Sequence, residues 1–188
     1  MSCEGCPSQG KCGKSSETCG IQSNPDNHIK NIITVMSGKG GVGKSTVTVM
    51  LAKAMAKKGL KVGIMDADIT GPSIPRLLAL SNEHAFGNEK QQLIPVESKE
   101  GIKVMSLNFL VQSESDPVIW RGPVIGGVVK QFYTDVVWGD LDVLLIDMPP
   151  GTGDVALTIM QSIPVQGVVM VSTPQPMVSM IVEKACHM

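Results

Sequence analysis

The sequence is poor in aromatic residues, in net charge and in long apolar runs, and each absence argues against a class of function. Its 188 residues include two Trp, one Tyr and three Phe, which leaves little material for stacking on nucleic-acid bases. Sixteen basic residues balance seventeen acidic ones, so we expect no basic patch for nucleic acid or anionic lipid. No apolar run approaches the ~18 residues of a membrane-spanning helix, and the first residues lack the series of a signal peptide. We therefore expect a cytoplasmic protein with neither a nucleic-acid nor a membrane partner.

The residues that are present divide the chain into two parts of different composition. Residues 1–28 are rich in Gly, Ser, Cys and Lys and contain one large aliphatic residue, Ile21, so they cannot build a hydrophobic core. Residues 29–188 carry the apolar segments, and a hydrophobic fraction of 43% over the chain is enough for one domain with its own core. We predict a disordered cysteine-rich tail over 1–28 and one domain over 29–188.

The domain begins with a strand, a glycine-rich turn, a helix and a second strand. The apolar run at 31–38 is typical of a buried strand. Apolar residues at helical spacing predict a helix over 44–58, and Gly59 suits its C-cap. The run at 60–65 predicts the next strand, which ends at Asp66. A unit of this kind joins parallel strands, so the sequence predicts a parallel sheet.

The rest of the chain continues the alternation of strands and helices. The further predicted elements are strands at 93–96 and 102–107, a helix at 122–137, strands at 141–146 and 167–173, and a last helix from near Pro176. The expected fold class is α/β, with a doubly wound and mainly parallel sheet. No strand follows the last helix, so we expect a fragment whose sheet is incomplete at the carboxyl end.

A phosphate-binding loop is the strongest chemical signal in the sequence. GKGGVGKS at 38–45 matches G-x-x-x-x-G-K-[ST] at every fixed position, between a predicted strand and a predicted helix. Glycines let backbone N–H groups turn toward phosphates, and the amino end of the helix points at them. An ordinary glycine-rich turn is the alternative, and the flanking elements argue against it. The residues predicted to bind the nucleotide are Gly38, Lys39, Gly40, Gly41, Val42, Gly43, Lys44, Ser45 and Thr46.

The polar side chains of this loop supply the expected chemistry of phosphoryl transfer. Lys44 would reach the β- and γ-phosphates of the nucleotide, and the Ser45 hydroxyl would ligate Mg²⁺. Lys39 is a second lysine within the loop. It is either a solvated surface charge or a cation presented to phosphates, including those of a neighbouring subunit, and the loop alone leaves both interpretations open.

Acidic residues end two of the predicted strands, at Asp66 and Asp147. The carboxyl ends of parallel strands lie beside the phosphate loop, where ligands bind in this architecture. Asp147 is the natural partner of Mg²⁺ through a water molecule, and Asp66 joins Asp147 and Ser45 in the predicted metal set. Asp68 is either a turn residue or the group that orients or deprotonates the attacking water. The predicted catalytic residues are Lys39, Lys44, Asp68 and Asp147.

Five motifs of the domain together resemble the Mrp (ApbC) family of iron–sulfur cluster carrier ATPases, of the deviant-Walker, MinD-like class. The resemblance covers residues 31–188 nearly end to end, and the motifs follow in the family's order: GKGGVGKST, DADITGPSIP, WRGP, IDMPPGTGD and STPQ. The resemblance implies ATP hydrolysis by a homodimer that encloses the nucleotide, with Lys39 contacting the partner's nucleotide. It also implies that Asp66, Asp68 and residues 70–73 lie in switch I and residues 147–154 in switch II. The implied function is to assemble [4Fe–4S] clusters or to transfer them to apoproteins.

Cysteines gather near the start of the chain, at Cys3, Cys6, Cys12 and Cys19. Cytosolic thiols stay reduced, so disulfides are the weaker interpretation. Four thiolates suit a [4Fe–4S] cluster or a structural Zn²⁺, and the spacing leaves these and unligated cysteines open. CEGCPSQGKC resembles the C-x-x-C-x5-C part of a cluster motif in longer members of the family, which favours iron and sulfur. Either Cys19 supplies the fourth ligand or the other three bind an incomplete or shared cluster.

Other features bear on the choice between hypotheses. The family's C-x-x-C pair beyond the last helix and its adenine-recognition segment have no counterpart before Met188, which again predicts a fragment. Cys186 is expected to be a small core residue. A second hypothesis is a MinD- or ParA-type switch on membrane or DNA, against which the neutral charge and the cysteines argue. A third is a reductase like the nitrogenase iron protein. It needs subunit-bridging cysteines, and none occurs between Lys39 and Ala185.

Overall fold

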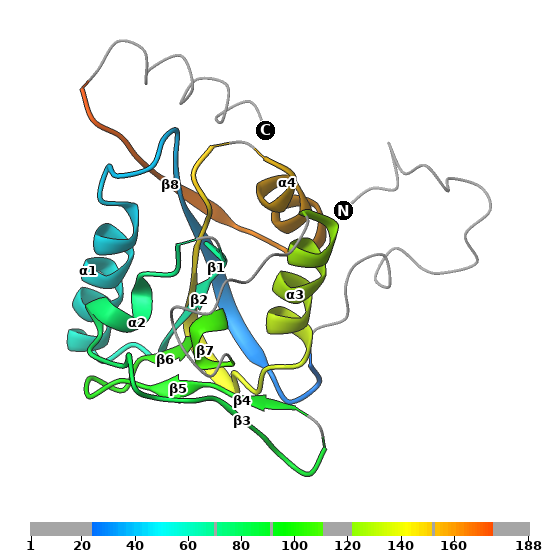
Figure 1. The fold of residues 1–188 in the computed structure, drawn as a ribbon. Coiled ribbons are helices and arrows are strands. Elements are labelled where there is room, and N and C mark those ends of the chain that lie inside the picture. The colour runs from blue at the N-terminus through cyan, green and yellow to red at the C-terminus, as the bar shows by residue number, and fades with distance from the viewer. Residues whose placement is uncertain (1–23, 70, 91, 111–121, 152, 175–188) are drawn as a thin grey trace.

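A six-stranded sheet forms the centre of the protein (Figure 1). The structure is a computed structural model, and it describes residues 24–69, 71–90, 92–110, 122–151 and 153–174. The strand order is β5-β6-β2-β7-β1-β8, and every neighbouring pair is parallel except β5 with β6. The strands are β1 (His28–Ser37), β2 (Val62–Asp66), β5 (Val96–Glu97), β6 (Lys103–Met105), β7 (Asp140–Asp147) and β8 (Gly167–Val171). The mainly parallel sheet predicted from the sequence is confirmed.

Helices cover both faces of this sheet. They are α1 (Lys44–Lys57), α2 (Ile74–Leu77), α3 (Gly122–Thr134) and α4 (Asp154–Ser162). In Figure 1, α1 and α2 lie on one side of the sheet and α3 and α4 on the other, which is the predicted doubly wound arrangement. The smaller elements are the 3₁₀ helix η2 (Leu107–Phe109) and a hairpin of β3 (Phe86–Gly87) with β4 (Leu93–Ile94). Within the described part of the chain, no helix is both long and apolar enough to cross a membrane.

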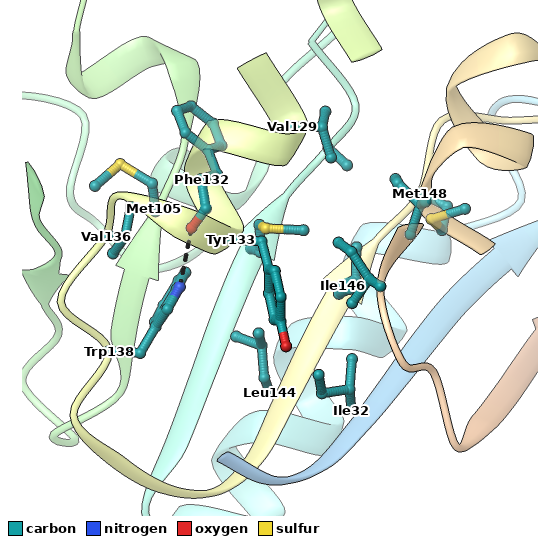
Figure 2. Packing of buried hydrophobic residues seen from close by; sticks show 14 of the residues in the cluster. Ile32, Met105, Val129, Phe132, Tyr133, Val136, Trp138, Leu144, Ile146 and Met148 are labelled. Carbon is teal, nitrogen blue, oxygen red and sulfur yellow. Dashed lines mark hydrogen bonds between the residues drawn. The ribbon is translucent and has the colours of Figure 1, made fainter. Parts of the chain in front are cut away.

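Each face of the sheet has its own hydrophobic core. Figure 2 shows the core beneath α3 and α4, where Phe132 of α3 packs in one cluster with Leu144 of β7. Trp138 is fully buried in this core, and its indole Nε1 donates a hydrogen bond to the backbone oxygen of Phe132 at 3.0 Å. Val49 of α1 and Leu145 of β7 belong to the opposite core. Because β7 buries side chains on both faces, its sequence is a nearly continuous apolar run.

The carboxyl ends of the central strands meet at one level of the sheet. Val35 of β1 and Asp66 of β2 are both paired in register with Asp147 of β7. The loop that follows β1 therefore starts beside both aspartates. We call the ends of β1, β2 and β7, with Lys44, Asp66, Asp68 and Asp147, the carboxyl edge. Ligands bind at such an edge in doubly wound sheets.

The differences from the predicted elements have local causes. α1 ends at Lys57 with Lys58 as its C-cap, and Gly59, the predicted C-cap, follows with φ of 84° and donates its N–H to the oxygen of Ala56. The strand predicted at 93–96 is present as two short strands, β4 and β5, rather than as one. Pro95 lacks an N–H, and it separates β4 from β5, which belong to different sheets. The strand predicted at 102–107 ends at Met105, because η2 begins two residues later.

Other boundaries also move by a few residues. The helix predicted at 122–137 ends at Thr134, and Val136 forms a bridge with Leu93 instead. β1 begins at His28, the last residue of the predicted tail. The tail up to residue 23 and the helix predicted from Pro176 lie outside the described residues.

Candidate functional site

The loop between β1 and α1 has the backbone of a phosphate cradle. Gly41 and Gly43 have φ of 76° and 88°, a left-handed conformation that residues with a Cβ adopt rarely. A Cβ built at Gly40, Gly41 or Gly43 would meet no described atom within 4 Å, so the loop faces open space there. Gly43 is the N-cap of α1, and the helix thus presents the free N–H groups of its first turn to the loop.

A cavity of about 290 Å³ opens at this loop. Loop glycines, Lys44 and Ser45 line it together with Asp68 and Ser73. Its volume lies near the lower end of the roughly 300–1,000 Å³ typical of ligand pockets. The cavity therefore suits phosphate groups with a metal ion better than it suits a whole nucleotide.

The Lys44 side chain joins the predicted catalytic residues. It is 7% exposed, and its Nζ lies 2.8 Å from Asp147 Oδ2 and 3.6 Å from Asp68 Oδ2. The same Nζ lies 3.4 Å from the Ser45 hydroxyl. A buried ammonium needs opposite charge nearby, and two carboxylates supply it here. The structure thus brings together four residues that the sequence predicted for one site.

Asp147 is the centre of this cluster. It is fully buried, and its Oδ2 accepts hydrogen bonds from Lys44 Nζ at 2.8 Å and from Ser45 Oγ at 2.6 Å. Its Oδ1 accepts a hydrogen bond from Thr48 Oγ1 at 2.8 Å. Sequence reasoning missed Thr48. The available signal was its spacing of one helical turn from Lys44, which puts both side chains on the same face of α1.

Asp66 is buried at the end of β2, in register with Asp147, and its carboxyl group differs from those of its neighbours in protonation. Burial, together with the negative charges of Asp147 and Asp68, raises its pKa to about 8. Its Oδ1 accepts a hydrogen bond from the backbone N–H of Asp68, and its Oδ2 accepts one from Ser106 Oγ, each at 3.2 Å. At pH 7 it is a neutral acid in the protein without metal, and a neutral carboxyl is a poor Mg²⁺ ligand. Its predicted role as a ligand stays a prediction. Sequence reasoning also missed Ser106.

The other predicted nucleotide-binding residues surround the cradle. Gly38 is buried, while Lys39 and Val42 are half-buried and Thr46 is exposed. The backbone oxygen of Lys39 accepts a hydrogen bond from Ser37 Oγ at 3.0 Å, which ties the loop to the end of β1. The action of Lys39 on a neighbouring subunit stays a prediction.

The donor atoms at the carboxyl edge fit Mg²⁺. The hydroxyl of Ser45 and the carboxylate of Asp147 are hard oxygen donors, and they lie 2.6 Å apart beside the loop. In the described residues, no group of three or more His, Cys, Asp and Glu side chains is arranged to hold a metal ion. The predicted cluster ligands lie outside these residues: Cys3, Cys6, Cys12 and Cys19.

A family model matches the chain over residues 28–188. It is a ParA model, described as the NUBPL iron-transfer P-loop NTPase. An iron–sulfur cluster carrier protein of Clostridium perfringens is 50% identical over 200 aligned residues, which cover 100% of this chain and 70% of the relative. Both findings agree with the resemblance found in the sequence motifs.

Solved structures show the same fold. The nucleotide-binding protein of Archaeoglobus fulgidus, in complex with ADP, is 49% identical with a TM-score of 0.73, and the match covers 85% of this chain and 60% of that one. The cell division ATPase MinD of Pyrococcus furiosus is 23% identical with a TM-score of 0.58, over 83% of this chain and 65% of that one, and shows the fold alone. The chain thus spans between 60% and 70% of the length of the two closer relatives.

Proposed function

The chain belongs to the family of NUBPL iron-transfer P-loop NTPases, and on that premise we propose that it is an ATP-hydrolysing carrier of iron–sulfur clusters. The observation that carries the proposal is the meeting of Lys44, Asp68 and Asp147 at the cavity of the phosphate loop. The ADP complex of the Archaeoglobus protein supports the phosphate groups of a nucleotide as occupants of this cavity. The name of the Clostridium relative supports clusters as the cargo.

ATP binding would proceed by an exchange of ion pairs at Lys44. In the protein without nucleotide, Asp147 and Asp68 neutralise its buried ammonium. A triphosphate brings several negative oxygens to the same position, and these compete with the two carboxylates for Lys44. Lys44 would turn from Asp147 to the β- and γ-phosphates, while the glycine loop donates backbone N–H groups to them.

Ser45 and Asp147 are the residues that would hold Mg²⁺. When bound, the ion neutralises charge on the β- and γ-phosphates. Ser45 would offer its Oγ directly, and Asp147 would act through a water molecule. Asp66 would hold the backbone of Asp68 beside this pair, because its carboxyl oxygen accepts a hydrogen bond from the backbone N–H of Asp68.

Asp68 and Lys39 would complete the hydrolytic site. Asp68 lies at the cavity with its carboxylate 3.6 Å from Lys44 Nζ, close enough to orient or deprotonate a water beside the γ-phosphate. Lys39 would act on the nucleotide of a second copy and neutralise the charge that develops during phosphoryl transfer. The active unit would therefore be a homodimer joined through the nucleotide sites.

The cargo would be a [4Fe–4S] cluster bound by thiolates of Cys3, Cys6 and Cys12, with Cys19 as the fourth ligand. Hydrolysis would move the segments that carry Asp68 and Asp147. That movement would couple the nucleotide state to release of the cluster to apo iron–sulfur proteins.

Cluster transfer to an apoprotein tests this proposal. The protein is reconstituted anaerobically with iron and sulfide and mixed with an apo [4Fe–4S] enzyme, whose recovered activity is followed with and without Mg-ATP. We expect transfer to depend on ATP in the wild type. Lys44→Ala should keep its iron but lose that dependence, while Lys61→Ala, at the opposite end of the sheet, should behave as the wild type.

The cysteine variant tests the cargo separately. We expect the combination of Cys3→Ser, Cys6→Ser and Cys12→Ser to retain less iron per chain than the wild type after reconstitution. Equal iron content in both proteins would remove the amino-terminal cluster from the proposal. If cluster transfer by Lys44→Ala still depends on ATP, the proposed role of the phosphate loop is contradicted.

A further inference from the structure

Thr48 places a hydroxyl group inside the protein, one helical turn beyond Lys44. Its side chain is fully buried, and Oγ1 lies 2.8 Å from Asp147 Oδ1 and 3.1 Å from the backbone oxygen of Lys44. A threonine hydroxyl has one proton to donate. The carboxylate is the stronger acceptor and the nearer one, so the proton points to Asp147.

The two carboxylate oxygens of Asp147 have different partners. Oδ2 is bonded by Lys44 and Ser45, the side chains that the nucleotide and Mg²⁺ would take over. Oδ1 is bonded by Thr48, which belongs to no fixed position of the phosphate-loop motif. Among the described residues, this is the one side-chain hydrogen bond to Asp147 that would survive nucleotide binding.

We propose that Thr48 is a positioning residue for the metal site. Its hydroxyl would hold Asp147 in place while Lys44 and Ser45 exchange their partners. The inference rests on the proposed function, because it supposes that Mg²⁺ and a nucleotide bind at the carboxyl edge. With Oδ1 held by α1, Oδ2 stays directed at Ser45 and at the ion that Ser45 ligates. The hydroxyl thus limits rotation of a carboxylate that would otherwise lose its partners.

The structure also offers a matched control for this role. Thr34 of β1 is a fully buried threonine, like Thr48, but its hydroxyl has no hydrogen-bond partner within the described part of the chain. Replacing either residue with valine removes one buried hydroxyl and keeps the branched shape. Only the change at Thr48 removes a contact with Asp147.

The test measures metal affinity rather than turnover. The whole chain is saturated with ADP, and binding of Mn²⁺, as a substitute for Mg²⁺, is followed by electron paramagnetic resonance. We expect Thr48→Val to weaken Mn²⁺ binding about 10-fold, the lower end of the range for loss of a residue that orients a direct metal ligand, because Asp147 would reach the ion through a water molecule. The affinity for ADP in EDTA should stay near the wild-type value. Thr48→Ser should restore Mn²⁺ binding, and Thr34→Val should leave it unchanged.

Each outcome decides the inference. Wild-type Mn²⁺ affinity in Thr48→Val would overturn it, and so would an equal loss of ADP affinity in EDTA, which indicates general damage to α1. If Thr48→Val does not fold, the test uses Thr48→Ala instead. Alanine removes the same hydroxyl and is a good helix former. If the wild type binds Mn²⁺ and ADP but hydrolyses no ATP, the proposed function is contradicted. The role of Thr48 would then still be decided by the Mn²⁺ affinity of its variants. A wild type that binds neither would overturn both.

Discussion

The two ends of the central sheet both carry ion pairs, but they treat their charges in opposite ways. At the carboxyl edge, Lys44 and Asp147 are 7% and 0% exposed and lie 2.8 Å apart. We call the starts of β1, β2 and β7, with Lys30, Lys61, Asp140 and Asp142, the amino edge. There Lys30 and Asp142 form a pair just as short, 2.7 Å, while 73% and 24% exposed. Removing charges from water is costly, so the buried cluster points to a function that the exposed pairs lack.

Cavity size by itself would have favoured the wrong end of the sheet. A cavity of about 530 Å³ at the amino edge is larger than the one of about 290 Å³ at the phosphate loop. The charges around the larger cavity are solvated, as the 75% and 70% exposure of His28 and Asp140 shows. Salt screens such pairs, and they contribute little to stability. Burial of charge, rather than volume, separates the two edges.

The largest expected effect of a substitution is at Lys39. We expect Lys39→Ala to lower kcat for ATP hydrolysis by about 10³–10⁵-fold, the range that a cation acting between subunits supplies in phosphoryl transfer. ATP should still bind, because Lys44 remains. Phosphate release and binding of a fluorescent ATP analogue measure the two properties. Lys61→Ala at the amino edge is the control and should keep the wild-type rate. A wild-type kcat in Lys39→Ala, or an equal loss of kcat in Lys61→Ala, would contradict the functional difference between the two edges.

Short-range patterns were enough to predict most of the carboxyl edge. The phosphate loop is a motif of fixed spacing, so residues 38–45 could be identified without a structure. Asp66 and Asp147 follow apolar runs, and the ends of parallel strands share one edge. Their meeting with Lys44 therefore followed from strand periodicity and chain direction.

Contacts between distant segments could not be predicted in this way. The spacing of Thr48 from Lys44 puts both side chains on one face of α1, but nothing near Thr48 in the sequence says that this face meets β7. Ser106 bonds Asp66 from 40 residues away, and the raised pKa of Asp66 depends on burial that only the packed sheet creates. The break at Pro95 was a local signal, since proline cannot join a ladder, and it was overlooked within an apolar run.

Strand β2 runs between the two edges, and the side chains packed around it leave no room for a larger residue at Gly63. A Cβ there would lie 2.6 Å from Cδ1 of Leu141 and 3.1 Å from Cε3 of Trp138. We expect Gly63→Ala to lower the free energy of unfolding by about 1–3 kcal/mol through overpacking, as measured by urea denaturation. Gly127→Ala is the control, because Gly127 is exposed in α3 and its Cβ would meet no described atom within 4 Å. Equal stability of both variants would show that the edges do not depend on this close packing.

The pH dependence of stability should differ between the edges. The pKa of Asp66 is about 8, well above 3.8, so between these values the folded protein holds a proton that the unfolded chain releases. The free energy of unfolding should fall as pH rises from 5 to 8, by up to about 1.4 kcal/mol per pH unit from this group. Asp66→Asn should remove that fall in urea titrations with EDTA and without nucleotide.

At the amino edge, the free energy of unfolding should depend on pH with the opposite sign. The hydrogen bond and charge of Lys30 lower the pKa of Asp142, so its contribution to stability is present above pH 4 and is lost as the pH falls further. Asp142→Asn should therefore change the pH profile only on the acid side. The same slope between pH 5 and 8 in Asp66→Asn and the wild type would mean that Asp66 is already ionised.

The smallest effect is expected at Lys30. Lys30→Ala should change the midpoint of urea unfolding only slightly and leave the rate of ATP hydrolysis unchanged at physiological salt, because its exposed ion pair is screened. Asp142 would keep its other bond, since the backbone N–H of Lys61 donates to Asp142 Oδ2 at 2.8 Å. A slower ATPase in Lys30→Ala with unchanged stability would contradict this expectation. Such a result would make the amino edge a functional surface, and burial of charge would no longer separate the two ends of the sheet.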